Sequence, residues 1–130
     1  GMKSAHDQAD LEALVAFVSS LPPPPRVASA DRARVARGQT VFGAYGCERC
    51  HAGGASDGKA HDIGSGSKDE RRQAFDTPTL TRVGRTAPYF HDGRYATLDD
   101  LLRSSDTEMV DGSKLADGDR LALEAYLETL

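Results

Sequence analysis

The stretch Gly46-Cys47-Glu48-Arg49-Cys50-His51 contains both cysteines of this 130-residue chain, and a histidine directly follows the second of them. Two thiols at this spacing can each add to one vinyl group of a haem, and the adjacent histidine can then bind the iron. The pattern therefore predicts covalent attachment of one haem c at Cys47 and Cys50, with His51 as an axial ligand.

Three other uses of the two cysteines have less support. A redox dithiol would open a helix after a strand in a βαβ unit, and the sequence predicts no such unit. A structural zinc would need a fourth ligand from His6, His61 or His91, none of which belongs to a second paired cluster. A disulfide across two residues would close too small a loop to stabilise the fold much.

Composition sets the class of protein. The chain is 38% hydrophobic and carries 16 Lys and Arg against 20 Asp and Glu, for a formal net charge of −4. This length suits one small domain, and the scattered charges give no sign of a phosphate-binding surface. No apolar run is long enough to cross a membrane.

The two ends of the chain carry similar amphipathic patterns. Residues 7–21 and 117–130 both place apolar side chains at helical spacing, and DLEALVAFVSSL (10–21) aligns with DRLALEAYLETL (119–130) without gaps. Four prolines at 22–25 end the first helix and predict an extended linker over residues 22 to about 28. The likeness is either the ordinary similarity of two amphipathic helices or the mark of a preceding domain whose terminal helix is residues 7–21.

The middle of the chain combines helices with a long loop. Asp31 can cap a helix that runs to about Tyr45 and leads directly into Cys47. Residues 52–77 show no sustained period and predict a loop that a cofactor would order. Thr97 to Asp100 resembles a capping box for a further helix. Because no strand pattern persists, we expect an all-α fold.

A sixth ligand for the iron is sought among the remaining residues. Met109 is the only methionine besides Met2, and it lies in the polar segment EMVDGSK, where a methionine is not needed to fill a core. This favours Met109 as the second axial ligand. His61, His91 and an open position, which would permit peroxide chemistry, remain alternatives.

Two stretches of the chain resemble known protein families. RGQTVFGAYGCERCHAG (37–53) is similar to the haem site of class I cytochromes c. FDTPTLTRVGRTAPYFHDGRYATLDDLL (75–102) resembles the C-terminal, electron-transferring haem domain of the bacterial di-haem cytochrome c peroxidase and methylamine-utilisation-type family. The resemblance covers about residues 30–130 and implies a class I cytochrome c fold with long loops around one covalently bound haem.

The resemblance also assigns roles to further residues. It implies that a helix glycine, Gly38, packs against Tyr126 of the last helix, and that the Pro78 carbonyl accepts the Nδ1 proton of His51. In the family, a methionine at this distance before the last helix often binds the iron. The resemblance therefore also favours Met109 as the second axial ligand. The family commonly places an arginine near a haem propionate at the position of Thr81, so Arg82 or Arg85 is the candidate here.

Other family features do not transfer as directly. The family binds calcium at its domain junction, and its Thr-x-Pro stretch corresponds to residues 86–88, but the side-chain ligand comes from another domain, so no calcium is assigned. His91 and Asp92 belong to the stretch 75–102 that resembles the di-haem family. They are expected to be structural groups near the haem edge or between domains.

The resulting prediction is a mono-haem c-type cytochrome domain that transfers one electron at a time within a larger multi-domain haem protein. Residues 1–28 form a leader, a remnant of a preceding domain's terminal helix followed by a proline-rich linker, and residues 29–130 form the cytochrome c domain. The alternatives are a haem peroxidase or oxidase domain of the di-haem family and a docking module. No catalytic side chain is assigned, so the chain is expected to be an electron-transfer domain rather than a self-sufficient enzyme.

The expected partners and location follow from haem chemistry. A redox protein or a preceding haem domain would exchange the electron, and neither nucleic acid nor a membrane span is expected. Covalent haem is attached outside the cytoplasmic membrane in bacteria, which predicts a periplasmic or otherwise extracytoplasmic protein.

Overall fold

Four α-helices dominate the computed structural model, which describes residues 8–22 and 31–130. They are α1 (Gln8–Ser20), α2 (Arg32–Ala44), α3 (Leu98–Ser104) and α4 (Asp117–Leu127). Four short 3-10 helices lie between them, at Cys47–Arg49, Ala52–Gly54, Val83–Arg85 and Gly112–Lys114. This mainly helical structure is compatible with the expected all-α class.

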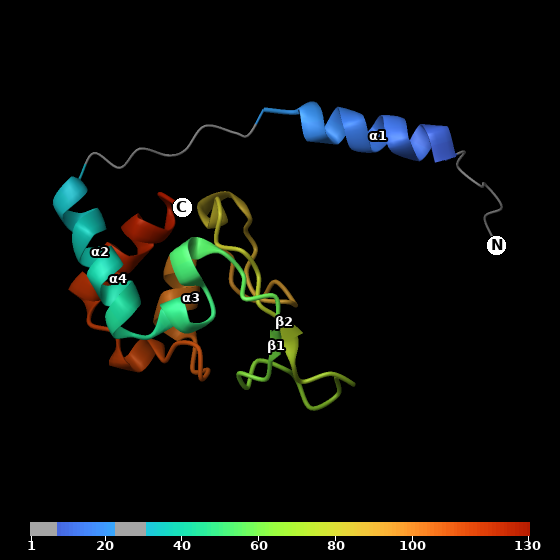
Figure 1. Ribbon diagram of the computed structural model, residues 1–130. Coiled ribbons are helices and arrows are strands. Elements are labelled where there is room, and N and C mark those ends of the chain that lie inside the picture. Colours follow the sequence, from blue (N-terminus) through green and yellow to red (C-terminus); the bar gives the residue numbers. More distant parts are fainter. Residues whose placement is uncertain (1–7, 23–30) are drawn as a thin grey trace.

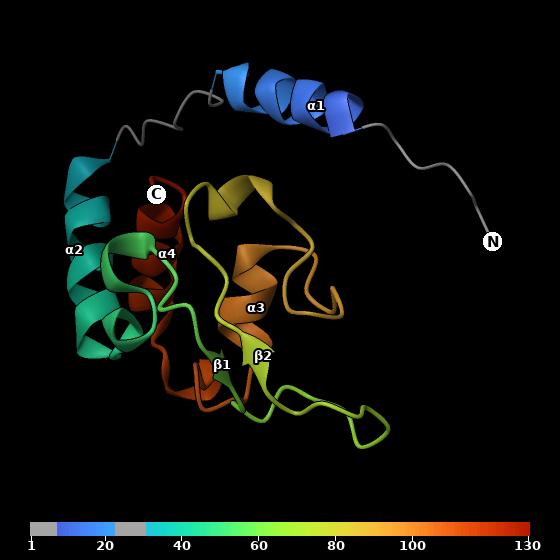
Figure 2. The same ribbon diagram turned by 45° about the vertical axis from the view of Figure 1, so that its right-hand side comes forward.

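The closest contact between helices joins α2 to α4, which lie side by side in both views (Figures 1 and 2). A Cβ placed on Gly38 would overlap the backbone carbonyl of Ala122 and lie 2.7 Å from Cβ of Tyr126. The Phe42 and Tyr126 rings meet edge to face beside this crossing, 5.4 Å apart. The predicted packing of Gly38 against Tyr126 is therefore confirmed.

The helix boundaries agree with the sequence signals. The Asp31 side chain accepts a hydrogen bond from the Arg34 amide at 2.9 Å, so α2 begins where the cap was predicted. The Thr97 side chain caps α3 in the same way, at 3.0 Å from the Asp100 amide. Both helices thus begin at capping residues that the sequence identifies.

A small core forms where α2, α3 and α4 meet. Its buried members include residues from the connecting loops as well as the helices: Val41, Phe42, Val83, Tyr89, Leu98, Leu102, Val110, Leu115, Leu123 and Leu127. Arg120 of α4, only 5% exposed, forms ion pairs with Asp99 of α3 and with Asp117. This buried pairing joins α3 to α4 beside the apolar core.

One difference from the sequence prediction lies in the long loop. Residues 52–77 contain two short strands, β1 (Ala60–His61) and β2 (Phe75–Asp76), which pair antiparallel with His61 opposite Phe75. Two-residue strands are too short to produce an alternating pattern, which explains why no strand was predicted there. They join the two ends of the loop and hold His61 in a defined place.

Helix α1 differs from α4 in its surroundings. It buries none of its residues, and its apolar side chains are all more than half exposed, namely Leu11, Leu14, Val15, Phe17 and Val18. In Figures 1 and 2 it stands apart from α2, α3 and α4. The predicted linker, apart from Pro22, lies outside the described residues. Within the described part of the chain no helix is long and apolar enough to cross a membrane.

Replacement of Gly38 by alanine tests the α2–α4 contact. The added methyl group has no room beside the Ala122 carbonyl, so the Gly38→Ala variant should lose about 1–3 kcal/mol of unfolding free energy, measured by urea denaturation. Gly43 of the same helix is the matched control, because the nearest atom to its added Cβ is 3.9 Å away. Gly43→Ala should be neutral or slightly stabilising, and equal effects of the two changes would contradict the packing.

Removal of residues 1–28 tests the independence of the remainder. Because α1 buries no residue and Asp31 still caps α2, residues 29–130 should keep the melting temperature of the whole chain in differential scanning calorimetry. The control is the same truncation extended to residue 34, which removes the cap and should lower the melting temperature. A lower value for the 29–130 chain would show that α1 contributes to the fold.

Candidate functional site

The Cys-Cys-His segment begins where α2 ends. Gly46 adopts a left-handed conformation (φ 75°), which turns the chain into the 3-10 helix Cys47–Arg49. The Cys47 carbonyl then accepts hydrogen bonds from the amides of Cys50, at 3.3 Å, and His51, at 2.9 Å. These bonds form a tight turn that holds both cysteines and the histidine close together.

His51 is a buried histidine with an unused nitrogen. It is 6% exposed, and its Nδ1 atom is buried without a hydrogen-bond partner. Burial lowers the pKa of His51, and the nearby Pro78 carbonyl offsets part of that effect without forming a hydrogen bond to Nδ1. The residue is thus neutral near pH 7, the state in which imidazole binds a metal.

Residues 77–81 lie against this segment. The Leu80 amide donates to the Gly54 carbonyl at 2.8 Å, and the Thr79 hydroxyl donates to the same carbonyl at 3.3 Å. These bonds bring Pro78 close to His51 from a separate part of the chain. The hydrogen bond from Nδ1 of His51 to the Pro78 carbonyl that the family resemblance implied stays a prediction.

The environment of Cys47 disfavours a reactive thiolate. Cys47 and Cys50 form no disulfide with each other, and Cys47 packs against the apolar core. Burial raises the pKa of the Cys47 thiol above its ordinary value. A redox dithiol depends on a lowered thiol pKa. The environment therefore supports an uncharged sulfur at Cys47 rather than an attacking one.

Cys50 belongs to a cluster that the sequence analysis did not identify. Its Sγ lies 3.9 Å from Nε2 of His61, and the same Nε2 lies 2.8 Å from a carboxylate oxygen of Asp57. These three potential ligand atoms lie within 4.8 Å of one another. Asp57 is four residues before His61, but such a pair is too common to have singled it out.

The geometry of this cluster limits its chemistry. A nucleophilic triad needs the two nitrogens of the histidine to face different partners, the nucleophile and the carboxylate. Here a single nitrogen of His61 faces both Cys50 and Asp57. A structural zinc site built on two thiolates is also disfavoured, because Cys47 is not part of the cluster.

Met109 lies on a loop with a closed base. The Gly112 amide donates to the Ser105 carbonyl at 2.7 Å, and the Thr107 amide donates to the Val110 carbonyl at 3.1 Å. Ser105 and Thr107 are buried at this base, and Met109 itself packs partly buried against the core. These hydrogen bonds hold the loop in one conformation, and Met109 is partly shielded from solvent.

Two contacts bring the Met109 loop towards the cysteine segment. The Glu108 amide donates to the Ile63 carbonyl at 3.0 Å, two residues after His61. On the other side, the Tyr45 hydroxyl at the end of α2 donates to the Lys114 carbonyl at 2.9 Å. A pocket of about 400 Å³ is lined by Tyr45, by residues 106–111 and by Lys114, and none of Cys47, Cys50 and His51 lines it.

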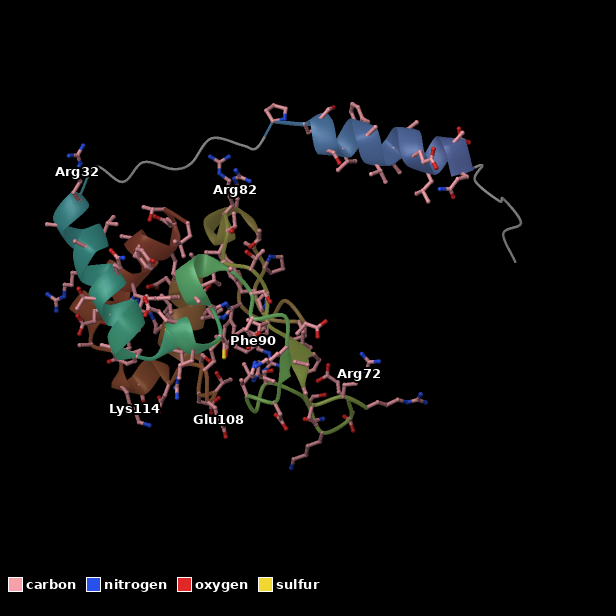
Figure 3. All side chains as sticks on the ribbon, viewed as in Figure 1. Arg32, Arg72, Arg82, Phe90, Glu108 and Lys114 are labelled. Carbon is pink, nitrogen blue, oxygen red and sulfur yellow. The ribbon has the colours of Figure 1, made fainter. Side chains whose placement is uncertain are left out.

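The remaining candidates are placed elsewhere. Arg82 has a left-handed backbone (φ 61°) and a buried Nε atom without a partner, while Arg85 is exposed. Arg82 lies at the end of the molecule opposite Glu108 and Lys114 (Figure 3). His91 stacks on Phe75, with ring centroids 3.6 Å apart, and pairs with Glu70 at 3.0 Å. His91 is therefore held by the loop that contains Glu70 and Phe75.

Comparison with known proteins agrees with a relationship to cytochromes c. The chain is 30% identical over 86 residues to a cytochrome c551 peroxidase of Nitrosomonas europaea, an alignment that covers 52% of this chain and 25% of that protein. This chain thus spans about a quarter of the length of the curated relative it matches. No family model matches the chain. No solved structure matches it either.

Alkylation of Cys47 tests the assignment of an unreactive thiol. In folded protein without haem, a Cys50→Ser variant leaves only Cys47 to react with iodoacetamide. The alkylation rate should rise with pH with an apparent pKa above that of an ordinary cysteine, because burial disfavours the thiolate. The same variant unfolded in urea is the control and should show the ordinary value. An apparent pKa below the control would restore the redox-dithiol interpretation.

Proposed function

We propose that this chain is a mono-haem c-type cytochrome domain that transfers single electrons as part of a larger haem protein. The observation that carries the proposal is the turn that holds Cys47 and Cys50 beside the buried, neutral His51 with its free Nδ1. The similarity to a cytochrome c551 peroxidase supports a haem-protein role.

Each residue of the Cys-Cys-His segment would have its own role in binding a haem. The sulfurs of Cys47 and Cys50 would form the two thioether bonds, and His51 would bind the iron through Nε2. The nearby Pro78 carbonyl would accept the hydrogen of Nδ1 and so orient the imidazole. When bound, the haem supplies an iron that gains and loses one electron between Fe(III) and Fe(II).

Met109 is the best candidate for the opposite axial ligand. The Glu108 amide of its loop bonds to the Ile63 carbonyl, and Lys114, which follows the loop, accepts a hydrogen bond from the Tyr45 hydroxyl just before the Cys-Cys-His segment. The rival ligands are engaged elsewhere, since Nε2 of His61 faces Asp57 and Nε2 of His91 faces Glu70. A thioether ligand raises the reduction potential relative to a second histidine, as suits an electron carrier.

Arginine side chains are proposed for the haem propionates. The buried Nε of Arg82 has no partner, so this guanidinium retains a donor for an anionic group. Arg85 ends the 3-10 helix that begins directly after Arg82, and it is exposed. Arg82 lies far from Glu108 of the Met109 loop (Figure 3), and Arg82 and Arg85 would supply the positive charge that pairs with the propionates.

The organisation of the whole protein is part of the proposal. The exposed apolar side chains of α1 support its assignment, within residues 1–28, to a preceding domain, with residues 29–130 as the cytochrome domain. The electron partner would be that domain or a separate redox protein. A periplasmic or other extracytoplasmic location follows from covalent haem attachment.

A haem peroxidase or oxidase domain is the second candidate, and the named activity of the similar protein favours it. It requires an open distal position and an acid–base group beside it. An optical spectrum of the purified, haem-loaded protein separates the two functions. A low-spin ferric spectrum that is unchanged by dilute cyanide or peroxide supports electron transfer, and a high-spin spectrum with rapid peroxide bleaching would establish the peroxidase.

Replacement of Met109 tests the axial ligand. In the Met109→Ala variant the weak sulfur-to-iron charge-transfer band should disappear and the reduction potential should fall, because the thioether ligand is lost. Met109→Leu keeps the apolar packing and should lose the band as well, which separates ligation from packing. Met2→Ala is the control and should keep both properties. A Met109→Leu protein with an unchanged spectrum would refute the assignment.

A further inference from the structure

We infer that α1 covers a basic helix of another folded unit in the way that α4 covers α2, with an arginine and a glycine of that helix at the crossing. The inference deepens the proposed function, because it rests on the assignment of residues 1–28 to a preceding domain and names the surface that α1 contacts there. Helix α1 stands apart from α2, α3 and α4, and its large apolar side chains are all more than half exposed (Figures 1 and 2).

Three kinds of contact hold α4 on α2. The Asp119 carboxylate pairs with the Arg37 guanidinium at 2.8 Å. The backbone of Ala122 fills the space that a Cβ on Gly38 would occupy. The ring of Tyr126 packs edge to face against an aromatic ring of α2. An acidic, a small and an aromatic residue, spaced by three and then four positions, therefore mark the face of α4 that covers α2.

Helix α1 repeats this set of residues at the same spacing. In the gapless alignment of the two helices, residues of the same three kinds stand at the acidic, small and aromatic positions, namely Asp10, Ala13 and Phe17. Leu14 stands at the place of Leu123, which is only 2% exposed in α4. The likeness therefore includes the acidic residue that pairs with α2, in addition to the apolar stripe that any two amphipathic helices share.

Charge indicates what kind of helix α1 would cover. Helix α2 (RARVARGQTVFGA) contains three arginines and no acidic residue, and its partner α4 has two aspartates in its first turn. Helix α1 (QADLEALVAFVSS) contains Asp10 and Glu12 and no basic residue. Two α1 helices from neighbouring copies of the chain would bring like charges together, which disfavours their pairing. A basic helix such as α2 is the complementary partner.

Neither the α2 of this chain nor that of a second copy offers the site. Gly38 is already covered, because Ala122 leaves no room there even for a Cβ. Helix α1 also differs from α4 at one buried position, where Leu11 replaces Arg120. Arg120 pairs with Asp99 of α3, so a leucine at this place would remove the ion pair that joins α3 to α4. The sequence of α1 therefore suits a different unit, with an apolar contact at this position.

The first test places the sequence of α1 on α2 within the full-length chain. In the in-register variant, residues 119–130 take the sequence of residues 10–21 while Arg120 is kept. This requires six substitutions: Leu121→Glu, Glu124→Val, Tyr126→Phe, Leu127→Val, Glu128→Ser and Thr129→Ser. The variant should still unfold cooperatively in urea, followed by circular dichroism, at a lower midpoint than the wild-type protein. The further change Arg120→Leu should lower the midpoint again, because the ion pair with Asp99 is lost.

The matched control is a variant shifted by one residue. Its residues 119–130 take the sequence of residues 9–20, again with Arg120 kept, so the inserted composition is nearly the same. The shift turns the apolar face by about 100° away from α2. The shifted variant should therefore show no cooperative transition in urea, in contrast to the in-register variant.

The second test identifies the covered helix directly. The photo-reactive residue benzoylphenylalanine replaces Phe17 in the protein as its cell makes it, and the cross-linked peptide is sequenced by mass spectrometry. The peptide should come from another unit and contain an arginine followed by a glycine. Benzoylphenylalanine at Ser19 is the control, because the aligned residue of α4, Glu128, is exposed. The control should give no such peptide, and its absence at position 17 as well would overturn the inference.

The outcomes separate the inference from the proposed function. Equal unfolding of the in-register and shifted variants would reduce the likeness of α1 to that of any amphipathic helix and overturn the inference. A wild-type dimer in analytical ultracentrifugation that Phe17→Asp abolishes would assign α1 to a second copy of the chain and overturn it as well. Neither result concerns the haem. Wild-type protein without covalent haem in mass spectrometry would overturn the proposed function, whereas the comparison of the helix variants does not depend on haem.

Discussion

The contact of α2 with α4 at Gly38 is the constraint on which the rest of the structure depends. It allows the two backbones to approach until any side chain at residue 38 would overlap the Ala122 carbonyl. A mid-helix glycine costs about 1 kcal/mol relative to alanine, and the contact explains why this helix contains one. Because α2 is fixed in this way, its end at Tyr45 determines where the Cys47 turn begins.

From that turn, three separate segments converge on the cysteines and His51. Residues 77–81 bind the Gly54 carbonyl, β1 places His61 against Cys50, and the Met109 loop is tied to Ile63 and to α2. A buried polar atom without a partner costs about 1–3 kcal/mol, and Nδ1 of His51 is such an atom. Under the proposed function the iron would be bound through Nε2 of His51, and the nearby Pro78 carbonyl would accept the hydrogen of Nδ1.

The sequence predicted the elements with local signals and missed those that depend on distant contacts. Asp31 and Thr97 predicted where their helices begin, because capping is a short-range interaction. Gly38 was identified because the family resemblance supplied its packing partner. The strands that pair His61 with Phe75 have only two residues each, so they leave no pattern in the sequence. Asp57 was missed for the same reason, since its importance appears only when β1 brings His61 to Cys50.

The same contacts bear on the choice between an electron carrier and a peroxide-reacting domain. If Met109 holds the iron as proposed, a peroxide-reacting domain would need Met109 to leave it, and the loop that carries Met109 is held by the Glu108–Ile63 hydrogen bond and by the buried pair of Ser105 and Thr107, whose hydroxyls lie 3.1 Å apart. A histidine that took over as acid–base group would have to leave its carboxylate, Asp57 or Glu70. Either route breaks interactions that the described residues already satisfy, whereas one-electron transfer uses the structure with little rearrangement. These contacts support the proposal of an electron carrier, although the similar protein is named as a peroxidase.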